Sequence, residues 1–284
     1  MTNSSLIIIC ISLLAAIFSS CETSQELTVM TYNIRYDNER DSINKWNNRK
    51  ERVTTLISEQ APDIFGIQEG LIQQVRYLDE HLPSYSRCGV GRDDGKEKGE
   101  FSALFYNKDK YVLGDCQTFW LSETPTQPGP GWDANLNRVV SWASLTHKES
   151  GREMFFFNTH FDHRGEEARR ESANLIIRKI QEIAGDAPII LTGDFNADPQ
   201  SVPYKTLVQD STLLRDAFIQ ANEKVNESSG TYASAFHEDN LSDRRIDHVF
   251  VSTHFEVLRH EIINTKQGSY YPSDHLPVKS MLRY

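Results

Sequence analysis

The chain has 284 residues and a formal net charge of −10, with 30 Lys and Arg against 40 Asp and Glu. Its near-average apolar and charged content excludes a disordered or fibrous protein. The negative charge argues against a protein that holds nucleic acid mainly through a basic face. It does not exclude a nuclease, because a bound divalent cation can make an acidic site receptive to phosphate. One large domain is expected at this length.

The first twenty residues carry no charge, and an apolar run covers residues 6–18. This run has the length of a signal-peptide core and is short for a bilayer span. Two serines and then Cys21 follow, which resembles a lipoprotein processing site at which Cys21 is lipidated. We expect a signal peptide over residues 1–20 and one domain over residues 25–284. A freely secreted protein and a retained anchor are the alternatives, and all three place the domain outside the cytoplasm.

Two cysteines remain if Cys10 is removed with the signal peptide and Cys21 is acylated. These two, Cys88 and Cys116, flank a predicted strand, and an oxidising compartment permits a disulfide between them. Two separate buried thiols are an equal alternative, because spacing alone does not bring two Cα atoms within disulfide reach.

Hydrophobic periodicity predicts alternating strands and helices in the first part of the chain. Strands are predicted over residues 27–32, 63–68 and 101–106, and helices over residues 49–60 and 72–82. The segment 118–137 holds three prolines, two glycines and two tryptophans without periodicity. Because few connections in a compact domain are this long, we expect a functional loop there.

The second half begins with two strands, 139–146 and 153–158, joined by a turn as a hairpin. Residues 166–184 have the clearest amphipathic pattern of a helix. Further strands are predicted over residues 187–192, 246–251 and 278–282, with a helix near residues 203–209. Hairpins mixed with helices indicate mixed sheets, and an α/β sandwich fits this pattern.

Polar residues follow several of these strands directly. Asn33 and Glu69 come after the first two strands, His160 follows the strand 153–158, and Asp194 and Asn196 follow the strand 187–192. Any one of them alone is explained by a turn. Ligands bind outside strand ends in open α/β sheets, so the repeated position predicts convergence on one site.

The residue types in this set suit metal and phosphate chemistry. Asn33 and Glu69 offer an amide oxygen and a carboxylate, which are ligands that Mg²⁺ accepts in proteins. Asp194 and Asn196 lie two positions apart on the same side of an extended chain. One of them can activate water while the other donates to a phosphoryl oxygen.

Six short motifs occur in a fixed order along the chain. They are TYNIR at 31–35, QE at 68–69, NTHFD at 158–162, TGDFN at 192–196, RIDHVFV at 245–251 and SDHLPV at 273–278. In this order they resemble the endonuclease/exonuclease/phosphatase superfamily, over essentially the whole chain after residue 20. The resemblance implies a four-layer α/β sandwich with two packed mixed β-sheets flanked by helices.

The resemblance also implies roles for the residues of these motifs. Asn33 and Glu69 match the metal ligands, and Asp274 matches an acidic residue near the metal, which is expected to be Mg²⁺ with Mn²⁺ as a substitute. His275 matches the histidine that contacts the scissile phosphate, and Asp247 matches the carboxylate that orients it.

The other motif residues are expected to act on the water and the substrate. Asp194 matches the residue that activates the attacking water, and Asn196 matches its partner on the phosphate. His160 stands where deoxyribonuclease-like members carry histidine. The remaining expected site residues are Glu100, which resembles the glutamate that pairs with this histidine, and two substrate-binding residues, Arg138 and Arg35. Glu and Arg at strand starts are also ordinary surface residues.

The implied reaction is in-line attack of an activated water on phosphorus, without a covalent intermediate. We expect a metal-dependent phosphodiesterase or phosphatase that acts on a small or lipid-linked phosphate, because the chain is acidic and lacks a Lys/Arg-rich stripe. A secreted nuclease acting on DNA or RNA is the alternative, and a catalytically idle binding module is a second one. A monomer is expected, with a membrane as partner if Cys21 is lipidated.

Overall fold

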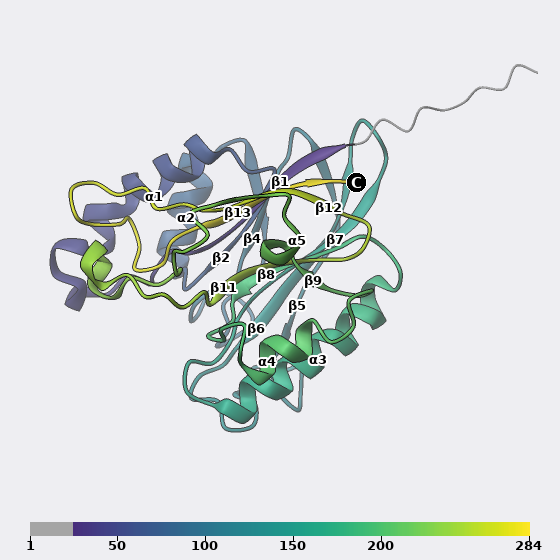
Figure 1. Ribbon diagram of the computed structural model, residues 1–284. Helices are drawn as coiled ribbons and strands as arrows, with labels where there is room; N and C mark the ends of the chain where they lie inside the picture. The colour runs from purple at the N-terminus through teal and green to yellow at the C-terminus, as the bar shows by residue number, and fades with distance from the viewer. Residues whose placement is uncertain (1–24) are drawn as a thin grey trace, which may run out of the picture.

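Two β-sheets pack face to face, and helices cover their outer faces (Figure 1). The computed structural model describes residues 25–284, so the predicted signal peptide over residues 1–20 and Cys21 lie outside the described residues. Within the described range, no helix combines the length and the apolar character that a membrane crossing requires.

The first sheet has seven strands in the order β10-β12-β13-β1-β2-β4-β3. Its strands are β1 (Glu26–Asn33), β2 (Ile64–Gln68), β3 (Tyr85–Cys88), β4 (Leu104–Asn107), β10 (Glu223–Val225), β12 (Glu256–Ile262) and β13 (Val278–Arg283). The second sheet has six strands in the order β5-β6-β7-β8-β11-β9. Its strands are β5 (Tyr111–Trp120), β6 (Val139–His147), β7 (Glu153–His160), β8 (Ile189–Asp194), β9 (Arg215–Asp216) and β11 (Asp247–Val251).

Both sheets are mixed. β1 runs parallel to β2 and antiparallel to β13, while β7 runs parallel to β8 and antiparallel to β6. The helices are α1 (Trp46–Gln60), α2 (Ile72–His81), α3 (Glu166–Ala184), α4 (Val202–Leu207) and α5 (Ala217–Gln220), with 3₁₀ turns η1 (Glu39–Asn44), η2 (Ser234–Phe236) and η3 (Glu238–Asn240). The predicted four-layer α/β sandwich is confirmed.

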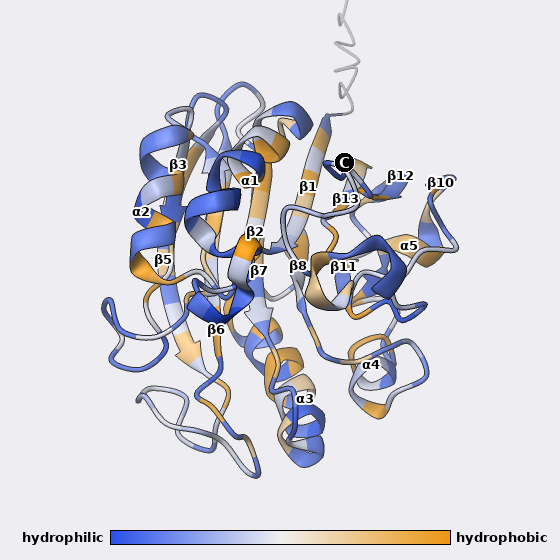
Figure 2. Cartoon of the chain, turned by 90° about the vertical axis from the view of Figure 1, so that its left-hand side faces the viewer, coloured by the Kyte–Doolittle hydropathy of each residue, from blue (hydrophilic) through white to orange (hydrophobic). Residues whose placement is uncertain are grey.

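The strand sequences explain the layers, because alternate side chains point to opposite faces of a sheet. In β1, Val29 lies in the core between the two sheets, while Met30 belongs to the core beneath α1 and α2. In β8, Ile190 lies between the sheets and Leu191 packs in the core beneath α3 and α4. Figure 2 shows hydrophobic residues along the strands, with the outer loops mostly hydrophilic.

Some predicted boundaries differ from the structure. The helix predicted from residue 49 begins at Trp46. The strand predicted from residue 101 begins at Leu104, because Phe101 makes only isolated bridges with Gly70 and Gly91. The loop predicted from residue 118 begins after Trp120, since β5 extends to that residue. The partly exposed strands β3, β5 and β12 have little hydrophobic alternation, and the sequence did not predict them.

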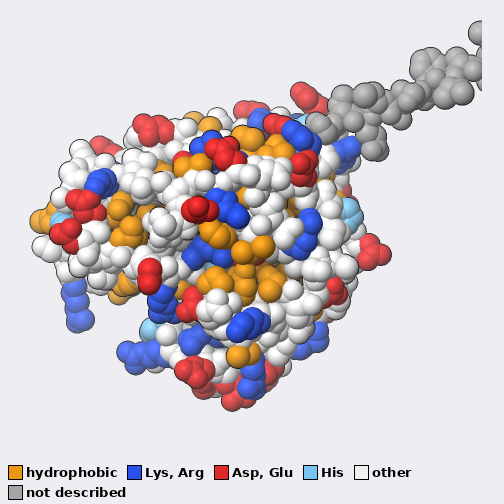
Figure 3. Space-filling model, in the orientation of Figure 1, with side chains coloured by type: hydrophobic (Ala, Val, Ile, Leu, Met, Phe, Trp, Pro, Cys, Tyr) orange, Lys and Arg blue, Asp and Glu red, His pale blue; other side chains and the backbone are white. Residues whose placement is uncertain are grey.

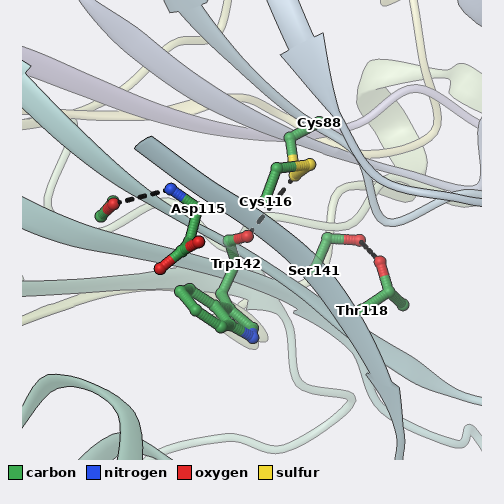
Figure 4. The surroundings of a disulfide bond; sticks show 7 residues. Cys88, Asp115, Cys116, Thr118, Ser141 and Trp142 are labelled. Atoms are coloured by element: carbon green, nitrogen blue, oxygen red, sulfur yellow. Dashed lines mark hydrogen bonds between the residues drawn. A yellow bond between two sulfur atoms is a disulfide. The ribbon is translucent and has the colours of Figure 1, made fainter. Parts of the chain in front are cut away.

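A disulfide joins Cys88 of β3 to Cys116 of β5, with their Cα atoms 5.9 Å apart (Figure 4). β3 is the edge strand of the first sheet and β5 the edge strand of the second. The bond therefore links the two sheets covalently. Of the two alternatives that the sequence left open, the structure contains the paired form.

Reduction of this disulfide is expected to lower the free energy of unfolding by about 3.5 kcal/mol, because a bridge restrains the unfolded chain according to the length of the loop it closes. The two cysteines are 28 positions apart. Urea unfolding with and without a thiol-free reductant measures the change. A Cys88→Ala/Cys116→Ala variant should match the reduced protein, and equal midpoints for the oxidised and reduced forms would contradict the expectation.

Two buried histidines are expected to make the protein sensitive to acid. Burial lowers the pKa of His248 in β11 to about 3 and that of His260 in β12 to about 4, from an ordinary 6.5. Below pH 6.5 these two histidines become protonated in the unfolded chain but stay neutral in the folded chain. Their contribution to the free energy of unfolding therefore falls as the pH drops from 6.5 toward 4. Between pH 7 and pH 5 the loss is about 2 kcal/mol for each histidine.

Urea unfolding at pH 7 and pH 5 measures this loss. Between pH 7 and pH 5, His260→Gln should lose about 2 kcal/mol less stability than the parent, while His81→Gln at an exposed position should lose as much as the parent. A His260→Gln variant with the full acid sensitivity of the parent would show that other groups cause it.

Candidate active site

The predicted site residues meet at one end of the two sheets. β1 ends at Asn33, and Glu69 follows β2 directly. Strand register alone places three further residues side by side, because His160 is the partner of Asp194 across β7 and β8, and Asp194 is the partner of Asp247 across β8 and β11. Six separate segments thus contribute to one site once the last motif, near Asp274, is added.

His275 is buried between two carboxylates. Its Nδ1–H donates to Asp247 Oδ2 at 2.9 Å, and its Nε2 lies 3.7 Å from Asp194 Oδ2. Burial opposes the charged form, but Asp247 and Asp194 raise the pKa of His275 well above its ordinary value. At neutral pH the side chain is therefore an oriented, protonated donor, suited to a phosphoryl oxygen.

Asp194 is the central carboxylate of the site. Burial and the neighbouring Asp247 raise the pKa of Asp194 to about 7, against the opposing effect of His275. The backbone N–H of Asn196 donates to Asp194 Oδ1 at 2.9 Å, and Asn33 Nδ2 donates to Asp194 Oδ2 at 3.0 Å. A fixed carboxylate with a pKa near neutrality is suited to accept a proton from water.

The predicted metal ligands lie next to this carboxylate. Asn33 Nδ2 also donates to Glu69 Oε1 at 3.1 Å, which brings Asn33, Glu69 and Asp194 together. Arg35 Nη1 lies 3.7 Å from Asp274 Oδ2 and 4.0 Å from Glu69 Oε2. Burial opposes ionisation of Glu69, but His275 and Arg35 lower its pKa, whereas burial raises the pKa of Asp274.

These residues fit a hard divalent cation. Four carboxylates gather here, on the buried Asp194, Asp247 and Asp274 and on the partly buried Glu69. Burial, and after it the neighbouring carboxylates, raise the pKa values of Asp194 and Asp274, and a bound cation would favour their ionised forms. Glu69 and Asp274 supply carboxylate oxygen atoms, which Mg²⁺ prefers. Asn33, predicted as a third ligand, instead turns its Nδ2 toward Glu69 and Asp194, and its Oδ1 accepts from the Arg35 backbone N–H at 3.0 Å. Ligand atoms of Asp194, Asp247 and His275 also lie within 4.8 Å of one another, but Asp247 already engages His275 Nδ1.

His160 lies beside Asp194, but the prediction that Glu100 pairs with His160 is wrong. Asn196 Nδ2 donates to His160 Nε2 at 3.2 Å, so the neutral ring carries its proton on Nδ1. Burial, then Arg138 and Arg92, lower the pKa of His160 well below its ordinary value. Glu100 does not pair with this ring. It accepts hydrogen bonds of 2.6 and 2.9 Å from Arg92, whose two parallel N–H groups match a carboxylate better than an imidazole does.

Arg138 lies beside His160 at the start of β6. Its side chain is buried, its Nη2 donates to His163 Nδ1 at 3.2 Å, and its Nε lies 3.5 Å from Asp162 Oδ2. Both predicted substrate-binding arginines thus lie near Glu69, since Arg35 Nη1 is 4.0 Å from its Oε2 and Arg138 lines the same small cavity as Glu69.

The sequence analysis missed Arg49 in α1. This buried guanidinium donates to four carbonyl oxygen atoms, those of Ile34, Arg35, Asn44 and Pro272. It therefore ties the loop after Asn33 to the segment before Asp274. Its position on the apolar face of the predicted helix, four residues before Val53, was the signal that could have revealed it.

Three site residues adopt left-handed backbone conformations, with φ of 57° at Arg35, 64° at Glu69 and 46° at Asn196. This region is uncommon for residues other than glycine, and it persists where the surrounding structure enforces it. In each case a motif residue is turned out of the strand direction at the site.

The chain is similar to known proteins in sequence and in structure. A model of the Endonuclease/Exonuclease/phosphatase family matches residues 30–275. A mannosyl-6-phosphatase from Bacteroides thetaiotaomicron is 40% identical, with a TM-score of 0.87, and the match covers 91% of this chain and 100% of that chain. An endonuclease/exonuclease/phosphatase family protein of the same organism is also 40% identical, with a TM-score of 0.88 and coverage of 92% and 98%.

More distant relatives match as well. Human Nocturnin is 26% identical over 261 residues, which cover 82% of this chain and 57% of that protein. The chain spans between 28% and 63% of the Nocturnin sequences from fly and frog that it matches.

Proposed function

The chain belongs to the endonuclease/exonuclease/phosphatase family, and on this premise we propose that it is a Mg²⁺-dependent phosphatase acting on a small phosphomonoester such as a sugar phosphate. The observation that carries the chemistry is His275, held as a donor between Asp247 and Asp194. The substrate class draws support from the mannosyl-6-phosphatase that is 40% identical over nearly the whole chain.

The residues divide the reaction among them. Asp194 takes a proton from the attacking water as the water oxygen bonds to phosphorus. His275 donates a hydrogen bond to a phosphoryl oxygen, and Asp247 holds the ring in place for this contact. The bond from phosphorus to the leaving oxygen breaks, that oxygen takes up a proton, and phosphate and an alcohol are released. A divalent cation held by Glu69 and Asp274 would supply positive charge to the phosphoryl group.

Space for a small leaving group adjoins the site. A polar groove of about 540 Å³ begins at Asn196 and is lined in part by Glu166, Arg169, Asp198 and Arg244. Such alternating carboxylates and guanidinium groups suit a ligand with many hydroxyl groups. Acidic and basic side chains are also interspersed over the face in Figure 3, an arrangement that suits a small substrate better than a nucleic acid backbone.

We also propose that the protein works outside the cytoplasm as a monomer, either secreted or attached to a membrane through lipidated Cys21. The disulfide between Cys88 and Cys116 supports this location, because such bonds persist in oxidising compartments.

A substrate comparison tests the proposal. The purified protein with Mg²⁺ is incubated with mannose 6-phosphate, glucose 6-phosphate, bis(p-nitrophenyl) phosphate and supercoiled DNA. We expect phosphate release from the sugar phosphates to be the fastest reaction. Faster nicking of DNA would support a nuclease instead, and the absence of turnover on every substrate would support an idle binding module.

A further inference from the structure

Four motif residues that the proposed reaction does not use form one buried polar layer between the two sheets. Each of the first four motifs supplies one of them, and all four are fully buried: Thr31, Gln68, Asn158 and Thr192. They lie in β1, β2, β7 and β8, one or two positions before the site residues of the same motifs. The layer therefore lies next to the site along all four strands.

The side-chain amide of Asn158 is the centre of this layer. Its Nδ2 donates to the Ile67 carbonyl at 2.8 Å and to the Ala103 carbonyl at 3.0 Å. Its Oδ1 accepts from Gln68 Nε2 at 2.7 Å and from Thr192 Oγ1 at 3.0 Å. An asparagine amide has two N–H donors and two acceptor positions, so all of them are used. The side chain is thus fixed in one orientation.

Three of these four hydrogen bonds cross from one sheet to the other. Asn158 lies in β7 of the second sheet. Ile67 and Gln68 lie in β2 of the first sheet, and Ala103 directly precedes β4 of the same sheet. The sheets approach closely at this point, because a Cβ atom on Gly66 would overlap Asn158 Oδ1. The hydrogen bonds of Asn158 therefore hold the two sheets at a fixed, short spacing.

The residues proposed for the reaction are divided between the same two sheets. Glu69 follows β2 of the first sheet. Asp274 is tied to that sheet as well, because the neighbouring Ser273 Oγ donates to the Asn33 carbonyl at the end of β1. Asp194 ends β8 of the second sheet. The spacing of the sheets thus determines how far the proposed cation ligands lie from the proposed base.

We propose that Asn158 and Gln68 are positioning residues, which set the distance between the cation ligands and the base Asp194. This inference rests on the proposed function. A displacement of about 1 Å far from the chemistry can lower a rate about 100-fold. Loss of the hydrogen bonds between the sheets leaves Glu69 and Asp274 together but changes their distance from Asp194. The expected result is a lower kcat with unchanged Mg²⁺ affinity.

Gln68→Met tests the inference with a small structural change. Met is similar in length but lacks the Nε2 donor, and Gln68 Oε1 has no hydrogen-bond partner to lose within residues 25–284. At saturating p-nitrophenyl phosphate, kcat should fall about tenfold, because two of the three hydrogen bonds between the sheets remain. Asn158→Leu removes all three and should lower kcat about 100-fold.

Mg²⁺ affinity is measured alongside kcat. The Mg²⁺ concentration at half-maximal rate, and the rise in Tm that Mg²⁺ causes, should be the same in Gln68→Met as in the parent. A layer that served only the stability of the fold would lower the Tm of the variants and leave kcat of the folded protein unchanged.

Thr31→Val is the matched control. Gln68 Nε2 also donates to Thr31 Oγ1 at 3.0 Å, but both residues belong to the first sheet. The variant therefore removes a hydrogen bond of the same side chain without breaking one between the sheets. It should lose about 1 kcal/mol of stability, as expected for one buried hydrogen bond, and keep the kcat of the parent.

The possible results distinguish this inference from the proposed function. An unchanged kcat in Gln68→Met would overturn the inference and leave the proposed phosphatase intact, whether or not Asn158→Leu folds. An equal fall of kcat in Thr31→Val would also overturn it, as would a weaker Mg²⁺ affinity in Gln68→Met. A parent protein that releases no phosphate from any monoester would instead refute the proposed function itself.

Discussion

Replacement of Asp194 by Asn is expected to lower kcat/KM by about 10⁴, near the upper limit for the loss of a general base. Asn keeps the shape of the side chain but cannot take the proton of the attacking water. His275→Ala should lower kcat/KM by about 10³, because it removes one fixed donor to the phosphoryl group. Initial rates of phosphate release from a sugar phosphate measure both losses.

Asp194→Asn also has an expected effect on stability, in the opposite direction. The folded-state pKa of Asp194 is raised to about 7 by burial and by Asp247, so ionisation at neutral pH works against the folded state. The neutral variant should therefore be more stable than the parent in metal-free buffer at pH 7. An inactive variant that had lost stability would point to misfolding as the cause, and full activity would refute the role of Asp194.

Removal of divalent cations is the second change with a large expected effect. EDTA should reduce turnover to background, and Mg²⁺ should restore it. Glu69→Gln should raise the Mg²⁺ concentration needed for half-maximal rate by about 100-fold. Substitution of a residue that only hydrogen-bonds to a metal ligand can already weaken metal affinity by this factor.

Metal binding can also be followed without activity. A cation at one hundred times its Kd stabilises the folded state by about 2.7 kcal/mol, so Mg²⁺ should raise the Tm of the parent far more than that of Glu69→Gln. Glu97→Gln, at an exposed carboxylate on the surface, is the control and should respond like the parent. A Tm shift in Glu69→Gln as large as in the parent would place the cation elsewhere.

Much of the site could be predicted because its residues directly follow buried strands. Strands such as β1 and β8 are specified by local hydrophobic pattern, and the parallel and antiparallel register then brings His160, Asp194 and Asp247 together. The order of the six motifs along the chain then indicated which residues belong to the same site. The roles of these residues in catalysis stay predictions that the variants above test.

The unpredicted features depend on partners distant in sequence. Arg92 lies in a loop rich in glycine and charge, where nothing local distinguishes a buried arginine from a solvated one. Its burial depends on Glu100 and on Trp120 at the end of β5. Likewise, Arg49 donates to a carbonyl 223 positions away, a contact that hydrophobic periodicity cannot report.

The hydrogen bonds of Arg49 bear on when the site can form during synthesis of the chain. It joins the loop after the first strand to Pro272, just before the last strand, and Ser273 Oγ likewise donates to the Asn33 carbonyl 240 positions away. The segments around Glu69 and Asp274, which are proposed to hold the cation, therefore meet only after nearly the whole chain has left the ribosome. A partly synthesised chain, or one clipped before Pro272, carries most of the catalytic motifs but no complete site. Hydrolysis is therefore expected only from a chain that extends through Asp274 and His275.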